Sequence, residues 1–166
     1  MDKQTKSGMP VDESKYSFTI PRTDEPREKI LKLGAMITDR IGKVTGNDPE
    51  YWGLAGVVTD EMADVALKMK GRKPKTTAQI AALTGKSEEE LEKLLTEMAY
   101  IGLVEYNWEN LDGKNPNHEK RWTLPQFVPG SAEFLNMRQS QINEHPEVAA
   151  FFERMTFLPL EKVTPM

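Results

Sequence analysis

The hydrophobic positions of the chain first follow a helical period. Thr23 or Asp24 can cap the start of a helix, and Gly46 can end it. Between these signals, apolar residues recur at steps of three and four, as on one face of a helix. They are Ile30, Leu33, Ile37, Ile41 and Val44.

A second helical region is expected from about Glu50 to Lys70. Thr59 can cap its second half, in which apolar residues share one face. Gly53 and Gly56 weaken the first half, so residues 51–58 are candidates for a separate turn.

Two capping boxes follow in close succession. In the first, Thr76 is followed three residues later by Gln79, and in the second, Ser87 is followed by Glu90. Each pair precedes an apolar stripe, and glycine follows each helix, at Gly85 and Gly102. Two capped helices joined by a short turn that contains glycine are typical of a helix-turn-helix.

After Gly102 the period changes to two, which indicates strands. Residues 104–108 and 122–124 alternate, and the polar segment 109–120 between them is typical of a hairpin tip. Residues 76–124 are therefore predicted to form a winged helix-turn-helix. Its expected core comprises Ile80, Leu83, Leu91, Leu94 and Leu95, closed on one side by Val104, Tyr106 and Trp122.

The predicted fold is mainly α with a β-hairpin, a winged helix-turn-helix flanked by N- and C-terminal helices. Residues 1–23 are expected to form a flexible, extended arm. Residues 24–130 form the winged-helix domain with its leading helix, and residues 131–166 form a C-terminal helical pair that ends in an apolar connector.

Composition excludes several kinds of site. The 166 residues include no cysteine, so disulfides, iron–sulfur clusters and thiolate zinc sites cannot form within this chain. No run of about 20 apolar residues could span a membrane, and no secretory signal opens the sequence. A cytoplasmic protein is expected.

The charge of the second predicted helix argues against DNA. In DNA-binding winged helices this helix enters the major groove, but here it carries five glutamates against one lysine (Lys93). Carboxylates would be repelled by the phosphates of that groove. If DNA does bind, the candidate contacts are Lys73, Lys75, Lys93, Lys114, Lys120 and Arg121.

No catalytic, cofactor-binding or metal-binding motif is present. His118 and His145 stand without ligand spacing, and the chain has no phosphate loop or nucleophile elbow. No active site can be assigned to this chain, and we expect it to hold neither metal nor flavin.

Four segments carry a resemblance to a known family: 51–57 (YWGLAGV), 105–110 (EYNWEN), 127–134 (FVPGSAEF) and 145–165, which begins HPEV. Together they resemble the N-terminal region of large anaerobe oxidoreductases of the pyridine nucleotide-disulfide oxidoreductase type, which also carry ferredoxin-like 4Fe-4S modules. The resemblance implies a parent oxidoreductase with iron–sulfur clusters and flavin, whose cofactor-binding regions are not in this chain. Separately, residues 76–104 are similar to the helix-turn-helix of MarR-type regulators, except for the acidic second helix.

The leading hypothesis is a non-catalytic docking or regulatory domain of a larger iron–sulfur flavin oxidoreductase. Its partner would be downstream domains of the same polypeptide, a redox partner protein or a second copy of the chain. The alternatives are a MarR-like transcription regulator that binds DNA as a dimer and a purely structural or oligomerisation module. Because the C-terminal apolar residues should not all be left in water, the expected docking surface comprises Phe151, Phe152, Phe157, Leu158, Leu160 and Val163.

Overall fold

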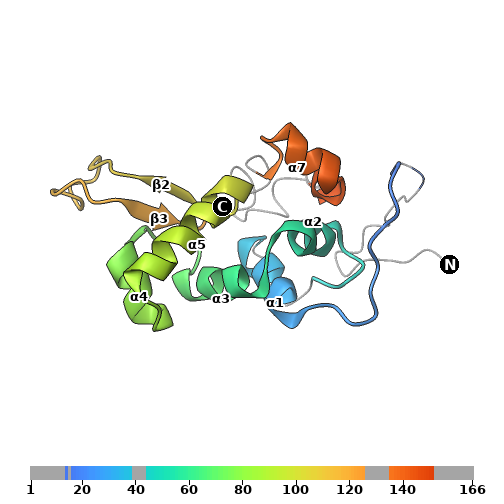
Figure 1. The fold of residues 1–166 in the computed structure, drawn as a ribbon, viewed down its shortest axis with the longest axis horizontal. Helices are drawn as coiled ribbons and strands as arrows, with labels where there is room; N and C mark the ends of the chain where they lie inside the picture. The colour runs from blue at the N-terminus through green and yellow to red at the C-terminus, as the bar shows by residue number, and fades with distance from the viewer. Residues whose placement is uncertain (1–13, 15, 39–43, 126–134, 152–166) are drawn as a thin grey trace.

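The described part of the molecule is mainly helical and contains one small antiparallel sheet (Figure 1). The structure is a computed structural model that describes residues 14, 16–38, 44–125 and 135–151. This confirms the expected class, mainly α with a β-hairpin. The elements are α1 (Glu28–Ile37), α2 (Pro49–Val57), α3 (Asp60–Met69), β1 (Lys75–Thr76), α4 (Thr77–Thr84), α5 (Glu88–Ile101), β2 (Glu105–Asn107), β3 (Arg121–Thr123) and α7 (Gln139–Glu144).

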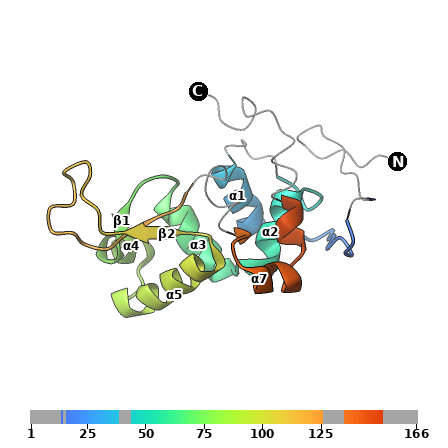
Figure 2. The same ribbon diagram turned by 90° about the horizontal axis from the view of Figure 1, so that it is seen from above.

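The hairpin of β2 and β3 projects from one end of the molecule, and α1, α2 and α7 gather towards the other (Figures 1 and 2). The three strands lie in the order β1-β3-β2, and both pairs are antiparallel. Trp122 in the central strand is aligned with Lys75 on one side and with Tyr106 on the other. The sequence did not predict β1, because a strand of two residues shows no alternation.

Both predicted capping boxes are present. The side chain of Thr76 accepts a hydrogen bond from the backbone N–H of Gln79 (3.2 Å), and the Gln79 side chain accepts one from the backbone N–H of Thr76 (3.0 Å). Ser87 and Glu90 make the same reciprocal pair at the start of α5. A left-handed glycine follows each helix, as predicted: Gly85 (φ 73°) and Gly102 (φ 90°).

The first helix starts later than the sequence predicted. Its N-cap residue is Arg27 rather than Thr23 or Asp24. The Thr23 hydroxyl instead accepts a hydrogen bond from the backbone N–H of Glu25, which forms a local turn before the helix. α1 ends at Ile37, and the prediction that included Ile41 falls outside the described residues.

Arg27 also accounts for the division of the second helical region into α2 and α3. Its guanidinium donates to the carbonyl oxygens of Ala55 (2.7 Å) and Val58 (3.0 Å) and pairs with Asp60 (3.0 Å). Carbonyls at the end of a helix lack partners within it, so this cation stabilises the end of α2. Val58 is extended, and Thr59 then caps α3 as predicted, accepting from the backbone N–H of Met62.

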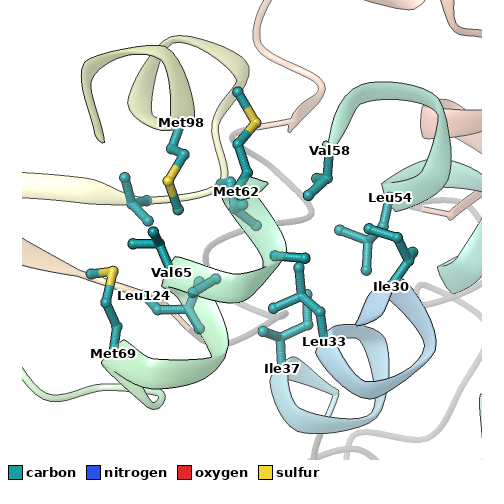
Figure 3. Close-up of a cluster of buried hydrophobic side chains, with 14 of the residues drawn as sticks. Ile30, Leu33, Ile37, Leu54, Val58, Met62, Val65, Met69, Met98 and Leu124 are labelled. Carbon is teal, nitrogen blue, oxygen red and sulfur yellow. The ribbon is translucent and has the colours of Figure 1, made fainter. Parts of the chain in front are cut away.

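The hydrophobic core is built by α1, α2, α3 and α5 together with Leu124 beside β3 (Figure 3). Leu94 is partly buried against this core. The prediction of burial is wrong for two residues: Leu83 is 47% exposed and Tyr106 is 45% exposed. Leu83 lies in the last turn of the short α4, whose buried contact is made by Ile80. The other predicted core residues are buried: Ile80, Leu91, Leu95, Val104 and Trp122.

The described C-terminal segment packs on the same core. Leu135, Val148 and Phe151 are completely buried. The expected break before Pro146 is present, because α7 ends at Glu144 and helix resumes over residues 147–151. The buried amide of Gln141 donates to the carbonyl oxygens of Ile101 and Leu135, which ties this segment to the end of α5.

Gly53 allows the close approach of α2 to residues 147–151. A Cβ atom added at Gly53 would lie only 2.8 Å from the Cβ of Phe151. Helix propensity predicts that Gly53 and Gly56 weaken a helix. The structure shows that both lie inside α2, where Gly53 provides space for an aromatic side chain.

We predict that Leu95→Ala lowers the free energy of unfolding by about 2–5 kcal/mol, because Leu95 is completely buried and its truncation leaves a cavity. Leu83→Ala removes the same atoms from an exposed site and should cost less than about 1 kcal/mol. Urea denaturation of both variants measures the difference. Equal losses would contradict this core assignment.

We predict that Gly53→Ala destabilises the protein by about 1–3 kcal/mol, because the new methyl group has to displace the Phe151 ring. Gly56→Ala is the matched control in the same helix. The atoms nearest to its added methyl group belong to the Glu147 side chain, which can change rotamer, so the better helix propensity of alanine should offset part of the cost. Thermal unfolding followed by circular dichroism compares the two; a Gly53→Ala variant as stable as the parent would argue against this contact.

Candidate interaction site

The hairpin presents three large hydrophobic side chains to solvent. Tyr106 and Trp108 are each about half exposed, at 45% and 51%, and Leu111 in the hairpin tip is 90% exposed. The two rings meet edge to face, with centroids 5.4 Å apart. With His118 and neighbouring polar residues, they line a shallow, open hollow of about 620 Å³.

Lys120 lies on the same side of the hairpin as these rings. Its ammonium lies 4.6 Å from the centroid of the Tyr106 ring and 4.2 Å from that of Trp122. Tyr106 and Trp122 are directly opposite one another in the strands, with ring centroids 5.0 Å apart. The aromatic cluster thus already binds one cation, which belongs to the chain itself.

Glu92 joins this cluster to the helices. Its carboxylate pairs with Lys120 (2.5 Å) and accepts a hydrogen bond from the Thr77 hydroxyl (3.0 Å). That hydroxyl in turn accepts from the indole N–H of Trp122 (3.0 Å). The chain of contacts from β3 through α4 to α5 orients the aromatic side of the hairpin towards the first turns of α5.

Glu88 and Glu89 lie one turn before Glu92, and therefore on the same side of α5. All three belong to the N-terminal half of the helix, where the helix dipole favours carboxylates. We call Glu88, Glu89, Glu92, Tyr106, Trp108 and Leu111 the hairpin–α5 surface. It combines apolar rings with negative charge.

Lys93 and Lys120, two of the six candidate DNA-contacting cations, pair with glutamates of α5. Lys93 pairs with Glu89 (3.2 Å) and Lys120 with Glu92. Both pairs place a carboxylate beside the cation, which reduces the positive charge available to a phosphate.

Three of the other four candidates also donate within the molecule. The Lys75 ammonium donates to the carbonyl of Met69 (2.6 Å), and burial, with Lys73 and Lys70 nearby, lowers its pKa. Lys114 lies 3.4 Å from Asp112, and Arg121 donates to the carbonyl of Lys114. Lys73 is exposed.

One residue of the predicted C-terminal docking surface, Phe151, is not available to a partner. Phe151 is completely buried against the core, so it is a packing residue and does not contribute an exposed face. The remaining members lie outside the described residues: Phe152, Phe157, Leu158, Leu160 and Val163.

The exposed aromatic side of the hairpin is not predicted by the sequence pattern. Tyr106 alternates with polar residues, as core-facing strand residues do, and was therefore expected to close one side of the core. Alternation alone does not reveal where the covering helices end. Leu111, an apolar residue within an otherwise polar tip, was the available signal for an exposed apolar surface.

No group of three or more histidine, aspartate or glutamate side chains that could hold a metal ion occurs among the described residues. His118 contacts the carbonyl of Trp108 through Nδ1 (3.0 Å), and His145 contacts the carboxylate of Glu147 (3.3 Å). Within the same ranges, no helix is long and apolar enough to cross a membrane.

Comparisons with protein-family models, curated proteins and solved structures gave no match to this chain.

The capping box of α5 yields a stability prediction. Ser87→Ala removes the acceptor for the Glu90 backbone N–H and should cost about 0.5–2 kcal/mol. The hydrogen bond from the Ser87 backbone N–H, followed by that from its hydroxyl, lowers the pKa of the Glu90 carboxyl below its ordinary value of 4.5. A lowered folded pKa stabilises the protein above the unfolded pKa, and this contribution is lost as the pH falls through the folded value.

Glu90→Gln should therefore reduce the loss of stability on acidification from neutral pH to below 4.5. Glu88→Gln, in the same turn but outside the capping box, serves as the control. Urea titrations of the parent and both variants, at neutral and acidic pH, measure the effect. An unchanged pH dependence in Glu90→Gln would contradict it.

Proposed function

We propose that this chain is a non-catalytic docking or regulatory domain built on a winged helix. The arrangement of α4, α5 and the β2–β3 hairpin supports the finer fold assignment. The pairing of β1 with the central β3 supports it further, because it joins the strand before the helix pair to the hairpin.

The observation that carries the docking assignment is the charge of α5. In a DNA-binding winged helix this element and the wing face the phosphates. Here, three exposed or partly exposed glutamates, Glu88, Glu89 and Glu92, line that side of the helix. Like charges in close approach repel by a few kcal/mol per pair before salt screening.

The lysines that pair with glutamates of α5 also argue against DNA binding. A protein that binds DNA gains affinity by neutralising phosphates and releasing counterions. Lys120 and Lys93 would first have to exchange Glu92 and Glu89 for phosphates, which leaves those carboxylates beside the DNA. The net gain in binding free energy per phosphate contact is therefore small.

We further propose that the domain belongs to a larger cytoplasmic iron–sulfur flavin oxidoreductase. Support comes from the resemblance of segments 51–57, 105–110, 127–134 and 145–165 alone. On this proposal 4Fe-4S clusters and flavin belong to the parent protein, and the docking partner is a downstream domain, a redox partner protein or a second copy. The apolar residues 152–163 remain a proposed part of the docking surface.

The second candidate is a MarR-like transcription regulator that binds DNA. It is favoured by the order of elements, a helix pair followed by a hairpin. Lys73, exposed just before β1, could reach a phosphate.

We predict that the protein has no affinity for random duplex DNA tighter than about 10⁻⁴ M at physiological salt, whereas non-specific binders reach about 10⁻⁴–10⁻⁶ M. Fluorescence anisotropy with a labelled duplex measures this. The variant Glu88→Lys/Glu89→Lys should gain affinity, with a log–log salt slope steeper by at most about 1.8.

Glu25→Lys/Glu144→Lys makes the same charge change at two exposed glutamates outside α5 and the hairpin and should gain less. Tight, salt-sensitive binding of DNA by the unmodified protein would refute the docking function and favour the regulator.

A further inference from the structure

We propose that the hairpin–α5 surface binds a basic, amphipathic segment of a partner protein, one that carries both lysine or arginine and large aliphatic side chains. This inference rests on the proposed docking function and names the chemistry of the partner.

The apolar part of the surface predicts aliphatic side chains in the partner. Trp108 and Leu111 leave large hydrophobic areas in water beside the hollow that they line. Exposed apolar area grouped in one hollow is typical of interaction sites, unlike single scattered residues. Tryptophan and tyrosine are also the residues that contribute most to binding at protein interfaces.

The charge of the surface predicts that the partner is basic. Glu88 and Glu89 lie one turn before Glu92, whose carboxylate pairs with Lys120 of the hairpin, and Glu109 lines the hollow itself. Lys93 and Lys120 offset Glu89 and Glu92, which leaves Glu88 and Glu109 as the carboxylates that an incoming cation would meet first. Complementary charge directs association and excludes acidic partners.

The rings also favour a cation. Lys120 already lies over Tyr106 and Trp122, which shows that this cluster accepts an ammonium group against its faces. Trp108, next in line along the same side of the hairpin, offers a further exposed ring. An arginine or lysine of the partner could contact this ring while its neighbours pair with the glutamates.

The hairpin tip is held in place before any partner arrives. Asn115 is buried, and its amide donates to the carbonyls of Glu109 (3.2 Å) and Glu119 (2.8 Å). Its amide oxygen accepts from the backbone N–H of Glu119 (3.1 Å). Nδ1 of His118 contacts the carbonyl oxygen of Trp108. A tip fixed in this way presents Trp108 and Leu111 at a lower entropic cost of binding.

The test uses the full chain and three labelled helical peptides of about four turns. One contains lysine and leucine on opposite faces, the second replaces lysine by glutamate, and the third replaces leucine by serine. Fluorescence anisotropy at physiological salt should give micromolar binding of the lysine–leucine peptide, with at least about tenfold weaker binding of the other two.

Variants then locate the site. Trp108→Ala should weaken binding of the lysine–leucine peptide by about tenfold or more, and Trp108→Phe should restore part of it. Glu88→Lys/Glu89→Lys should weaken binding similarly, although it strengthens DNA binding. Two controls should leave peptide binding unchanged: Met137→Ala, which removes an exposed hydrophobic side chain elsewhere, and Glu25→Lys/Glu144→Lys, which changes exposed charges outside α5 and the hairpin. Circular dichroism verifies that each variant is folded.

The outcomes separate the two proposals. Absence of lysine–leucine binding, equal binding of the glutamate or serine peptide, or an unaffected Trp108→Ala variant would each overturn this inference while leaving a docking function at another surface possible. Tight binding of duplex DNA by the unmodified protein would instead overturn the proposed function itself.

Discussion

The buried indole of Trp122 is the constraint on which the sheet and its supporting helices depend. Trp122 occupies the central strand, completely shielded from solvent, with β1 on one side and β2 on the other. A buried indole N–H requires an acceptor, and Thr77 provides it from the first turn of α4. The position of α4 relative to β3 is therefore fixed by one hydrogen bond as well as by apolar contact. Because Thr77 also donates to Glu92, the same constraint extends to α5.

This chain of contacts gives the acidic character of α5 a structural origin. Carboxylates are favourable in the first turns of a helix, and Glu90 and Glu92 have specific partners in the capping box and in Lys120. Glu88 has no such contact among the interactions described here. Glu88 lies one turn before Glu92, which pairs with Lys120 beside the rings. An exposed carboxylate at this position is therefore a better indication of binding than the total charge of the helix.

Features that depend on neighbours in the sequence could be predicted, and features that depend on distant parts of the chain could not. The capping boxes at Thr76 and Ser87 act within one turn, so their residue types sufficed. The start of α1 is set by Arg27 at the α2–α3 junction, a contact between distant segments. The exposure of Tyr106 and the burial of Phe151 likewise depend on where packing elements end, which periodicity does not reveal. The hairpin–α5 surface was missed for this reason.

The same geometry has opposite consequences for nucleic acid and for protein. A helix and a projecting hairpin on one side of a domain form a surface that suits an elongated ligand of either kind, and the side chains decide between them. Lysine side chains that point into solvent would attract phosphate. Here, however, Lys120 lies over the rings of Tyr106 and Trp122 and pairs with Glu92. Glu92 thereby neutralises a cation that a DNA-binding protein would use, and the rings lie against it. The hollow on the hairpin is lined by the rings, Leu111 and Glu109, and its natural complement is a positively charged, amphipathic protein segment.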